Sequence, residues 1–327
     1  MNRILKWTSA LVAFALTASW LSNHSWRHPS GLVGSQKVIY ATYLSNPSEY
    51  VNYTLSEFHQ SRDPYFDAAR ILTYQVLHAP ETRTRLDIEL VIFVHENVDQ
   101  HKKDRLRRDG AHLIEWSDFS VDWVRPKDAR WTHIMTKLRL WQMVQYDLIL
   151  FLDVDTILTR PLDDIFNAPE IQPQAPILSQ SHYHEVDVPL PPSYLLLGLP
   201  QLRTNHSALP SRVPEDFWDW ETINSGFMVL KPSLEIFRYF ESVLKIVDSF
   251  DGSIGDQSVI NHVFSPLGPM PWKHINLSWN IQWPWAEDIH TGGYASFHEK
   301  WWAPMHWETN AYFRAWYWRM VGYYDSI

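Results

Sequence analysis

Short apolar runs alternate with segments of helical periodicity along most of this chain. The apolar runs cover 37–42, 87–95, 111–115, 146–152 and 227–230, and the helical patterns cover 64–77, 100–108, 132–144, 233–247 and 255–263. Strands rich in Val, Ile and Leu between helices are typical of a mostly parallel sheet with both faces covered. Because crossovers between parallel strands are right-handed, the pattern predicts an α/β domain of the Rossmann type.

The chain begins with a separate hydrophobic segment. Residues 8–21 carry no charge, and two basic residues precede them. This run is shorter than the roughly 20 residues of an ordinary membrane span, so it fits a signal peptide or a short signal anchor. We favour the anchor, because the basic residues lie on the expected cytoplasmic side. The predicted organisation is then 1–22 for this segment, 23–35 for a short stem and 36–327 for a single domain.

Four Asn-X-Ser/Thr sequences follow the N-terminal segment. They begin at Asn23, Asn52, Asn205 and Asn276 and match the acceptor pattern of N-glycosylation. Together with the hydrophobic segment they predict a secretory-pathway protein. We expect a single-pass type II protein of the Golgi membrane with a lumenal domain, and secretion is the alternative.

Composition narrows the possible functions. The 327 residues include no Cys, which excludes disulfides, Cys-ligated zinc and thiol catalysis. A net charge of −9 argues against binding to a nucleic-acid backbone. Nine of the 18 Trp residues lie in 272–318, where their rings could fill a core or stack on sugars. The Pro-rich, polar range 169–215 is predicted to be a long loop or insertion.

Two carboxylates directly follow the apolar strand at 146–152. Asp153 and Asp155 would lie beyond the carboxyl end of a sheet strand, where α/β folds bind ligands. Such a pair can hold one Mg²⁺ or Mn²⁺ ion, which in turn binds a diphosphate. A nucleotide-sugar glycosyltransferase uses this arrangement, and so does a haloacid-dehalogenase-like phosphatase, with Asp153 as nucleophile. The phosphatase nucleophile normally follows the first strand of its domain, whereas three predicted strands precede this one.

Four motifs occur in a specific order around this pair. They are Thr136-Lys137-Leu138 with Trp141, Asp153-Val154-Asp155, Asn224-Ser225-Gly226, and Gly255-Asp256-Gln257. The set resembles glycogenin and its relatives, the retaining glycosyltransferases of family 8, over about residues 130–265. The resemblance implies a GT-A fold, with a mostly parallel central sheet covered by helices, here followed by a Trp-rich C-terminal region.

The resemblance also implies roles for individual residues. A Mn²⁺ or Mg²⁺ ion would be held by Asp153, Asp155 and His298, with His306 as the other candidate for the third ligand. The implied catalytic residues are Lys137, Asp256 and Gln257. The implied contacts to the nucleotide sugar are Thr42, Tyr43, Leu44, Arg130, Lys137, Asp153, Val154, Asp155, Asn224, Ser225, Asp251 and Lys300. The spacing between Asp251 and Asp256 is two residues longer than in glycogenin.

The function implied is metal-dependent transfer of a sugar, with retention, from a nucleotide diphosphate, by family default a UDP-sugar. The acceptor would be a glycan or another hydroxyl compound, and the expected partners include the membrane but no nucleic acid. Two alternatives are the phosphatase and a non-catalytic glycan-binding protein. The latter would leave the paired aspartates and the Gly-Asp-Gln segment without a purpose.

Overall fold

The computed structural model describes residues 36–46, 63–181, 183–184, 186–207 and 214–327, which belong to one compact unit. The predicted anchor and stem, and the acceptor sequences at Asn23 and Asn52, lie outside the described residues. Asn205 and Asn276 are both exposed. Within the described ranges, no helix is both long and apolar enough to cross a membrane.

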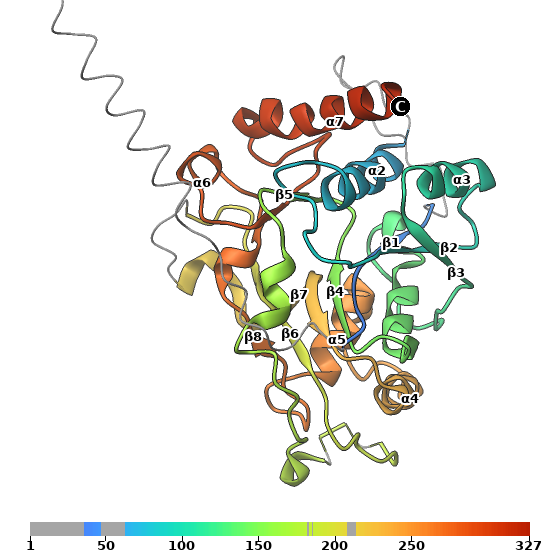
Figure 1. Cartoon of the computed structure of the whole chain (residues 1–327). Coiled ribbons are helices and arrows are strands. Elements are labelled where there is room, and N and C mark those ends of the chain that lie inside the picture. Colours follow the sequence, from blue (N-terminus) through green and yellow to red (C-terminus); the bar gives the residue numbers. More distant parts are fainter. Residues whose placement is uncertain (1–35, 47–62, 182, 185, 208–213) are drawn as a thin grey trace, which may run out of the picture. The chain divides into compact units, whose positions relative to one another are not determined.

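A seven-stranded sheet forms the centre of this unit (Figure 1). Its strands in spatial order are β3 (His112–Trp116), β2 (Leu90–His95), β1 (Val38–Leu44), β4 (Leu148–Leu152), β7 (Phe217–Leu230), β6 (Leu196–Leu202) and β8 (Lys273–His274). The first four are mutually parallel, β7 is antiparallel to both of its neighbours, and β8 is parallel to β6. The predicted α/β class with a mostly parallel sheet is therefore confirmed. The carboxyl ends of β1 to β4 meet at one edge.

A second, three-stranded sheet joins distant parts of the chain at that edge. It contains β5 (Thr156–Leu158), β10 (Ser296–His298) and β9 (Ile281–Gln282). Strand β10 runs antiparallel to β5, so His298 lies opposite Thr156. This pairing brings the C-terminal third of the chain to the residues that directly follow β4.

Helices cover both faces of the central sheet (Figure 1). One face carries α2 (Pro64–Leu77), α3 (Gln100–Arg108) and α7 (Asn310–Asp325), and the other carries α4 (Leu234–Val243), α5 (Asp256–Val263) and the 3₁₀ helix η2 (Ile134–Gln142). Successive strand residues alternate between the two cores, as the two-residue period of a strand requires. The remaining helices are α6 (Ala286–Thr291), η1 (Ala129–Trp131), η3 (Asp163–Asn167), η4 (Leu178–Gln180), η5 (Pro214–Asp216), η6 (Gly252–Ile254), η7 (Leu277–Trp279) and η8 (Trp307–Thr309).

Local sequence explains where the well-predicted helices begin. The side chain of Asp63 accepts a hydrogen bond from the backbone N–H of Phe66, and Pro64 occupies the first turn of α2. The hydroxyl of Ser233 accepts from Ile236 N in the same way at the start of α4. Both helices therefore start at the predicted positions.

The structure differs from the predicted elements in three places. The range 169–215 is not a continuous loop, because its apolar residues 196–202 form the buried strand β6 between β7 and β8. The helix predicted over 132–144 is 3₁₀ over Ile134–Gln142, and that geometry still buries Leu138 and Trp141 on one side. The C-terminal tail, in which no periodicity was recognised, ends in the 16-residue helix α7.

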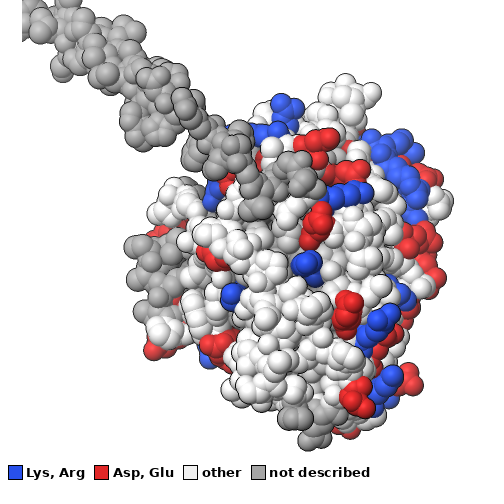
Figure 2. All heavy atoms as spheres, turned by 60° about the horizontal axis from the view of Figure 1, so that its bottom comes forward, with Lys and Arg blue, Asp and Glu red and all other residues white. Residues whose placement is uncertain are grey.

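On the face drawn in Figure 2, basic and acidic side chains are interspersed among large uncharged areas. They do not gather there into a broad patch of one sign. This face therefore presents no concentrated field of the kind that attracts polyanions.

Candidate active site

A pocket of about 330 Å³ opens where β4 ends. The elements around it come from both sheets and from several helices. Thirteen of the residues expected in the site line this pocket, namely Tyr43, Leu44, Arg130, Lys137, Asp153, Val154, Asp155, Asn224, Ser225, Asp256, Gln257, His298 and Lys300. Residues separated by up to 257 positions in sequence thus face one cavity.

Asp153, Asp155 and His298 form a compact group in the pocket. Each offers one ligand atom, and these atoms lie within 4.8 Å of one another. His298 Nε2 is 3.2 Å from Asp155 Oδ1 and 3.9 Å from Asp153 Oδ2. Two carboxylates and one imidazole are a donor set that suits Mn²⁺, and carboxylates also suit Mg²⁺. The residues present therefore fit a divalent cation.

The charges around Asp155 keep this carboxylate ionised. Burial alone would raise its pKa, but His298 and Lys300 outweigh burial and hold the pKa of Asp155 below its usual value. Lys300 Nζ lies 3.4 Å from Asp155 Oδ2. Burial would lower the pKa of His298, and Asp155 raises it above the usual histidine value. A proton on His298 and a cation between the aspartates would therefore compete for this site.

Lys137 joins helix η2 to this group of candidate metal ligands. Its side chain is only 2% exposed, and its Nζ lies 3.1 Å from Asp153 Oδ1 and 2.9 Å from Asp256 Oδ2. Burial would lower the pKa of Lys137, but the two carboxylates raise it, so the ammonium stays charged. Lys137 thus fixes one of the candidate ligands and the first residue of helix α5.

Gly226 lies against the same group, a contact that was not predicted. Residues 224–226 form part of strand β7 and not a tight turn. A Cβ atom at Gly226 would lie 2.3 Å from His298 Cε1 and 2.8 Å from Asp153 Oδ2. The backbone N–H of Asp153 donates to Gly226 O over 2.9 Å. The glycine is needed here because backbone and ligands approach too closely for any side chain.

Some expected donor-binding residues lie elsewhere. Thr42 is fully buried within β1 and does not line the pocket. Asp251 is exposed, and its Oδ1 accepts from Ser253 N, so it begins η6 and does not face the pocket. Arg130 lines the pocket while its guanidinium pairs with Asp128.

His306, the rival third ligand, belongs to neither group of possible metal ligands within the described residues. Its ring stacks on Trp285, with the ring centroids 3.5 Å apart. Burial lowers the pKa of His306. Of the two histidines considered, only His298 lies beside the paired aspartates.

Nine pocket residues were not predicted, namely Ser45, Tyr65, Trp131, Ile134, Gln201, Ile254, Gln282, Trp283 and Glu299. Gln201 lies in the range expected to be a loop, and Gln282 lies in a two-residue strand that only tertiary pairing creates. Trp283 has a positive φ of 50°, an unusual conformation for a bulky residue and one that often marks functional sites. A Gln or Trp alone gives no motif from which these positions could be found.

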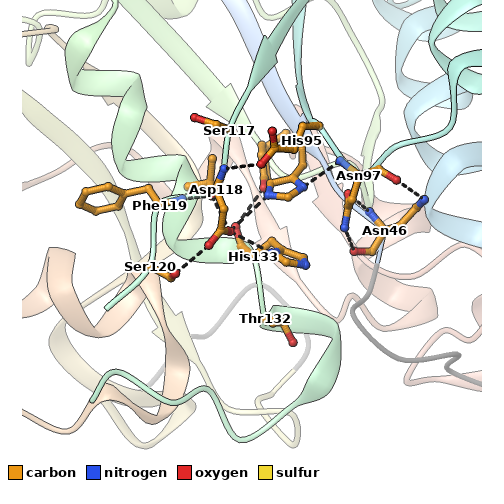
Figure 3. A network of polar contacts seen from close by, with 12 residues as sticks. Asn46, His95, Asn97, Ser117, Asp118, Phe119, Ser120, Thr132 and His133 are labelled. Atoms are coloured by element: carbon orange, nitrogen blue, oxygen red, sulfur yellow. Dashed lines mark hydrogen bonds and ion pairs between the residues drawn. The ribbon is translucent and has the colours of Figure 1, made fainter. Parts of the chain in front are cut away.

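A second group, His95, Asp118 and His133, follows the ends of β2 and β3 (Figure 3). His95 Nε2 and His133 Nδ1 lie 3.2 and 2.9 Å from Asp118 Oδ1. Asn97 N donates to His95 Nδ1 over 3.1 Å, so in the neutral ring the proton of His95 lies on Nε2 and faces Asp118. A protonated Nε2 cannot bind a metal ion. The group is a hydrogen-bond network that connects the strand ends behind the pocket.

That network also reaches the end of β1, where Tyr43 lines the pocket. The side chains of Asn46 and Asn97 exchange hydrogen bonds with each other's backbone over 2.8–3.1 Å (Figure 3). The hydroxyl of Tyr43 donates to His133 O over 2.9 Å. The end of β1 is therefore held both from β2 and from the start of η2.

No model of a known protein family matches the chain. It is 27% identical over 259 residues to an uncharacterised protein of Schizosaccharomyces pombe, covering 69% of this chain and 65% of that protein. It is 26% identical over 195 residues to UDP-glucuronate:xylan alpha-glucuronosyltransferase 1 of Arabidopsis thaliana, covering 58% of this chain and 22% of the relative. Human glycogenin-1 is 26% identical over 148 residues, covering 45% of this chain and 30% of the relative. The chain thus spans less than two thirds of the length of each relative.

Among solved structures, the apo form of the glycosyltransferase GlyE of Streptococcus pneumoniae is similar to the chain. It is 12% identical, covers 89% of this chain and 63% of its own, and has a TM-score of 0.49.

Proposed function

We propose that this chain, a homologue of glycogenin-like glycosyltransferases as its motifs indicated, transfers a sugar from a nucleotide diphosphate to a hydroxyl acceptor. The reaction depends on a divalent cation, the donor is a UDP-sugar, and the anomeric configuration is retained. The observation that carries the proposal is the group of Asp153, Asp155 and His298 on a pocket whose other walls hold Lys137 and Lys300.

In this reaction the pocket must stabilise a departing diphosphate and an oxocarbenium-like sugar. Asp153, Asp155 and His298 would hold Mn²⁺ or Mg²⁺, which when bound supplies positive charge to the diphosphate oxygens. Lys300 adds a cation beside Asp155. The cation and the Lys300 ammonium are both charged before the reaction begins. They can therefore stabilise the leaving diphosphate without any rearrangement of the site.

Orientation is supplied by the residues at the start of α5. The carboxylate of Asp256 is buried and held by Lys137 at 2.9 Å. Gln257 Oε1 accepts from Ser225 N over 3.0 Å, which fixes its amide against strand β7. These side chains orient donor and acceptor for attack from the face on which the diphosphate leaves. No covalent intermediate is needed.

Thermal unfolding with and without ligand tests this function. We expect UDP together with Mn²⁺ to raise the melting temperature of the wild-type protein, because ligands that bind only the folded state stabilise it. Asp155→Ala should lose this stabilisation and the metal-dependent turnover of UDP-sugars. The matched control is Asp122→Ala at an exposed position away from the pocket, which should behave as wild type. Full activity of Asp155→Ala would exclude the proposal.

The same experiment separates the alternatives. A phosphatase with Asp153 as nucleophile would release phosphate from small phosphoesters and would not need UDP. A glycan-binding protein would be stabilised by sugars without turnover of any donor. Stabilisation by UDP only when Mn²⁺ is present is expected of the transferase alone.

We also propose that the catalytic domain lies in the lumen of the secretory pathway, anchored by residues 1–22 in the Golgi membrane. The supporting observations are the charge-free run at 8–21 and the exposure of Asn205 and Asn276. Removal of N-linked glycans should increase the mobility of the protein on a gel. An unchanged mobility of the expressed protein would argue against a lumenal domain.

A further inference from the structure

Four side-chain amides form a connected network on one wall of the pocket, with Gln201 at its centre. Gln201 Oε1 accepts from Asn224 Nδ2 over 2.8 Å and from Gln257 Nε2 over 3.1 Å. Gln201 Nε2 donates to Gln282 Oε1 over 2.8 Å and to Leu202 O over 3.1 Å. All four amides line the pocket. Gln201 therefore links residues of β6, β7, β9 and α5.

Backbone groups fix the orientation of the outer amides. Gly226 N donates to Asn224 Oδ1, so the NH₂ group of Asn224 must face Gln201. Ser225 N donates to Gln257 Oε1, which orients the NH₂ group of Gln257 in the same direction. Since both neighbours present donors, Gln201 must present its oxygen to them. Exchanging O and N in any of these amides would place two donors or two acceptors opposite each other.

This arrangement leaves two N–H groups for a ligand. Each NH₂ group carries two N–H bonds, and Asn224 and Gln257 each use one of them on Gln201. Among the described residues, no second acceptor contacts either nitrogen within hydrogen-bond distance. Asn224 is two residues from Gly226, which touches His298 and Asp153, so this wall directly adjoins the metal-binding group. The pocket thus offers paired donors at the place where a sugar next to a diphosphate would lie.

Each cation that lines the pocket lies beside a carboxylate of the protein, and none belongs to the wall formed by the four amides. Lys137 lies between Asp153 and Asp256, and Lys300 lies beside Asp155. The third cation is the guanidinium of Arg130. It pairs with Asp128, a residue that does not line the pocket. A negatively charged sugar would bring another carboxylate to a wall that offers only neutral donors. Burying a charge without a partner is costly, whereas a neutral oxygen accepting from an amide is not.

We propose that Gln201 is a positioning residue that orients Asn224 and Gln257 to bind a neutral donor sugar through its hydroxyl or carbonyl oxygens. This inference rests on the proposed transferase function and narrows its substrate class to neutral sugars, excluding uronic acids. Because the inference assigns this wall to the sugar, Gln201 should affect use of the sugar and not affinity for UDP.

Gln201→Met tests the inference, because Met has a similar length but is only a weak acceptor for the two amides and cannot donate to Gln282. We expect kcat/KM for neutral UDP-sugars to fall at least tenfold, the effect of losing one to two hydrogen bonds. The dissociation constant of UDP with Mn²⁺ should stay within about twofold of wild type. Gln145→Met, at an exposed position outside the pocket, is the matched control and should change neither value.

A second variant covers the case in which Gln201→Met does not fold. Gln201→Glu keeps an oxygen for both amides but places its second carboxylate oxygen against Gln282 Oε1 and Leu202 O. Its activity on neutral donors should therefore lie between those of wild type and Gln201→Met, with the same affinity for UDP. If UDP affinity and turnover fall together in both variants, the role of Gln201 is structural and the inference is wrong. Unchanged kcat/KM in Gln201→Met would overturn it as well.

A comparison of donors on the wild-type protein tests the substrate class. We expect Mn²⁺-dependent hydrolysis of one or more of UDP-glucose, UDP-galactose and UDP-N-acetylglucosamine, and none of UDP-glucuronate. Preference for UDP-glucuronate would contradict the neutral subsite while leaving the transferase function intact. If wild-type protein bound no UDP in the presence of Mn²⁺, the proposed function itself would fail, and this inference with it.

Discussion

At the scale of single residues, the candidate metal site depends on one position that carries no side chain. Gly226 allows β7 to touch both Asp153 and His298, whose ligand atoms lie 3.9 Å apart. Two ligands from opposite ends of the sequence can approach each other only because nothing projects between them. The close approach of Asp153 and His298 therefore requires glycine at position 226.

Gly226→Ala should damage metal binding without removing any ligand. The added Cβ would lie 2.3 Å from His298 Cε1, so the imidazole or the strand must move. A displacement of about 1 Å at an active site can reduce turnover roughly a hundredfold, and we expect a loss of this order. Isothermal titration with Mn²⁺ and UDP-sugar turnover would measure the two effects.

Gly322→Ala is the matched control for this substitution. Gly322 lies in α7, and no neighbouring atom lies within 4 Å of the position that a Cβ would take. It should bind Mn²⁺ as wild type does. Wild-type affinity for Mn²⁺ in Gly226→Ala would mean that the cation binds elsewhere.

At the scale of elements, local signals predicted the parts of the fold that local interactions determine. Helix α2 was predicted with both of its ends, since Asp63 and Pro64 mark its start and its periodicity is regular. Strand β4 was recognised from an unbroken apolar run. Strand β6 was missed because it contains Gly198 and Pro200, and its burial depends on partners that are distant in sequence.

The same distinction holds for the site. Asp153 and Asp155 could be named because a recognisable strand precedes them, and His298 only because the family resemblance implied a third ligand. Gln201 and Gln282 could not be predicted. Their side chains form a hydrogen bond between two strands that come together only in the folded protein. Asp251 was misplaced, since it is exposed and begins η6.

Helix α7 was the largest element to escape prediction, yet it packs against α2 (Figure 1). Met320 is fully buried in this contact. Met320→Ala should lower the free energy of unfolding by about 2–5 kcal/mol, the usual cost of removing a large buried side chain. Urea denaturation would measure this loss.

Met305→Ala makes the same change at a side chain that is 51% exposed. It should alter the free energy of unfolding by no more than about 0.5 kcal/mol. Equal losses in the two variants would show that α7 does not contribute to the core.

At the scale of the whole molecule, a half-buried histidine makes stability depend on pH. Burial and the neighbouring His184 lower the pKa of His262 from 6.5 to about 4. Below pH 6.5 the unfolded chain therefore binds a proton at His262 that the folded protein does not bind. This group consequently lowers stability as the pH falls from 6.5 to about 4, and it has no effect on stability above that window.

His262→Gln removes this contribution. Its melting temperature should fall less than that of wild type when the pH is lowered from 7 to 4, as measured by circular dichroism at several pH values. His101→Gln, at an exposed position on α3, should follow the wild-type curve. Parallel curves for wild type and His262→Gln would place the acid sensitivity at other groups.

Because α7 packs on α2, one face of α2 can be covered only after the C-terminal end of the chain has been synthesised. Trp301 precedes α7 in the chain and donates a hydrogen bond to Pro64 O at the start of α2. The two residues are 237 positions apart. A ribosome adds about 5–20 residues per second, so the outer face of α2 waits roughly 10–50 s for its partner. His298 reaches Asp153 and Asp155 late in the same interval. A nascent chain thus exposes an apolar helix face that chaperones can bind, and it gains a complete metal-binding group only after residue 298 has left the ribosome.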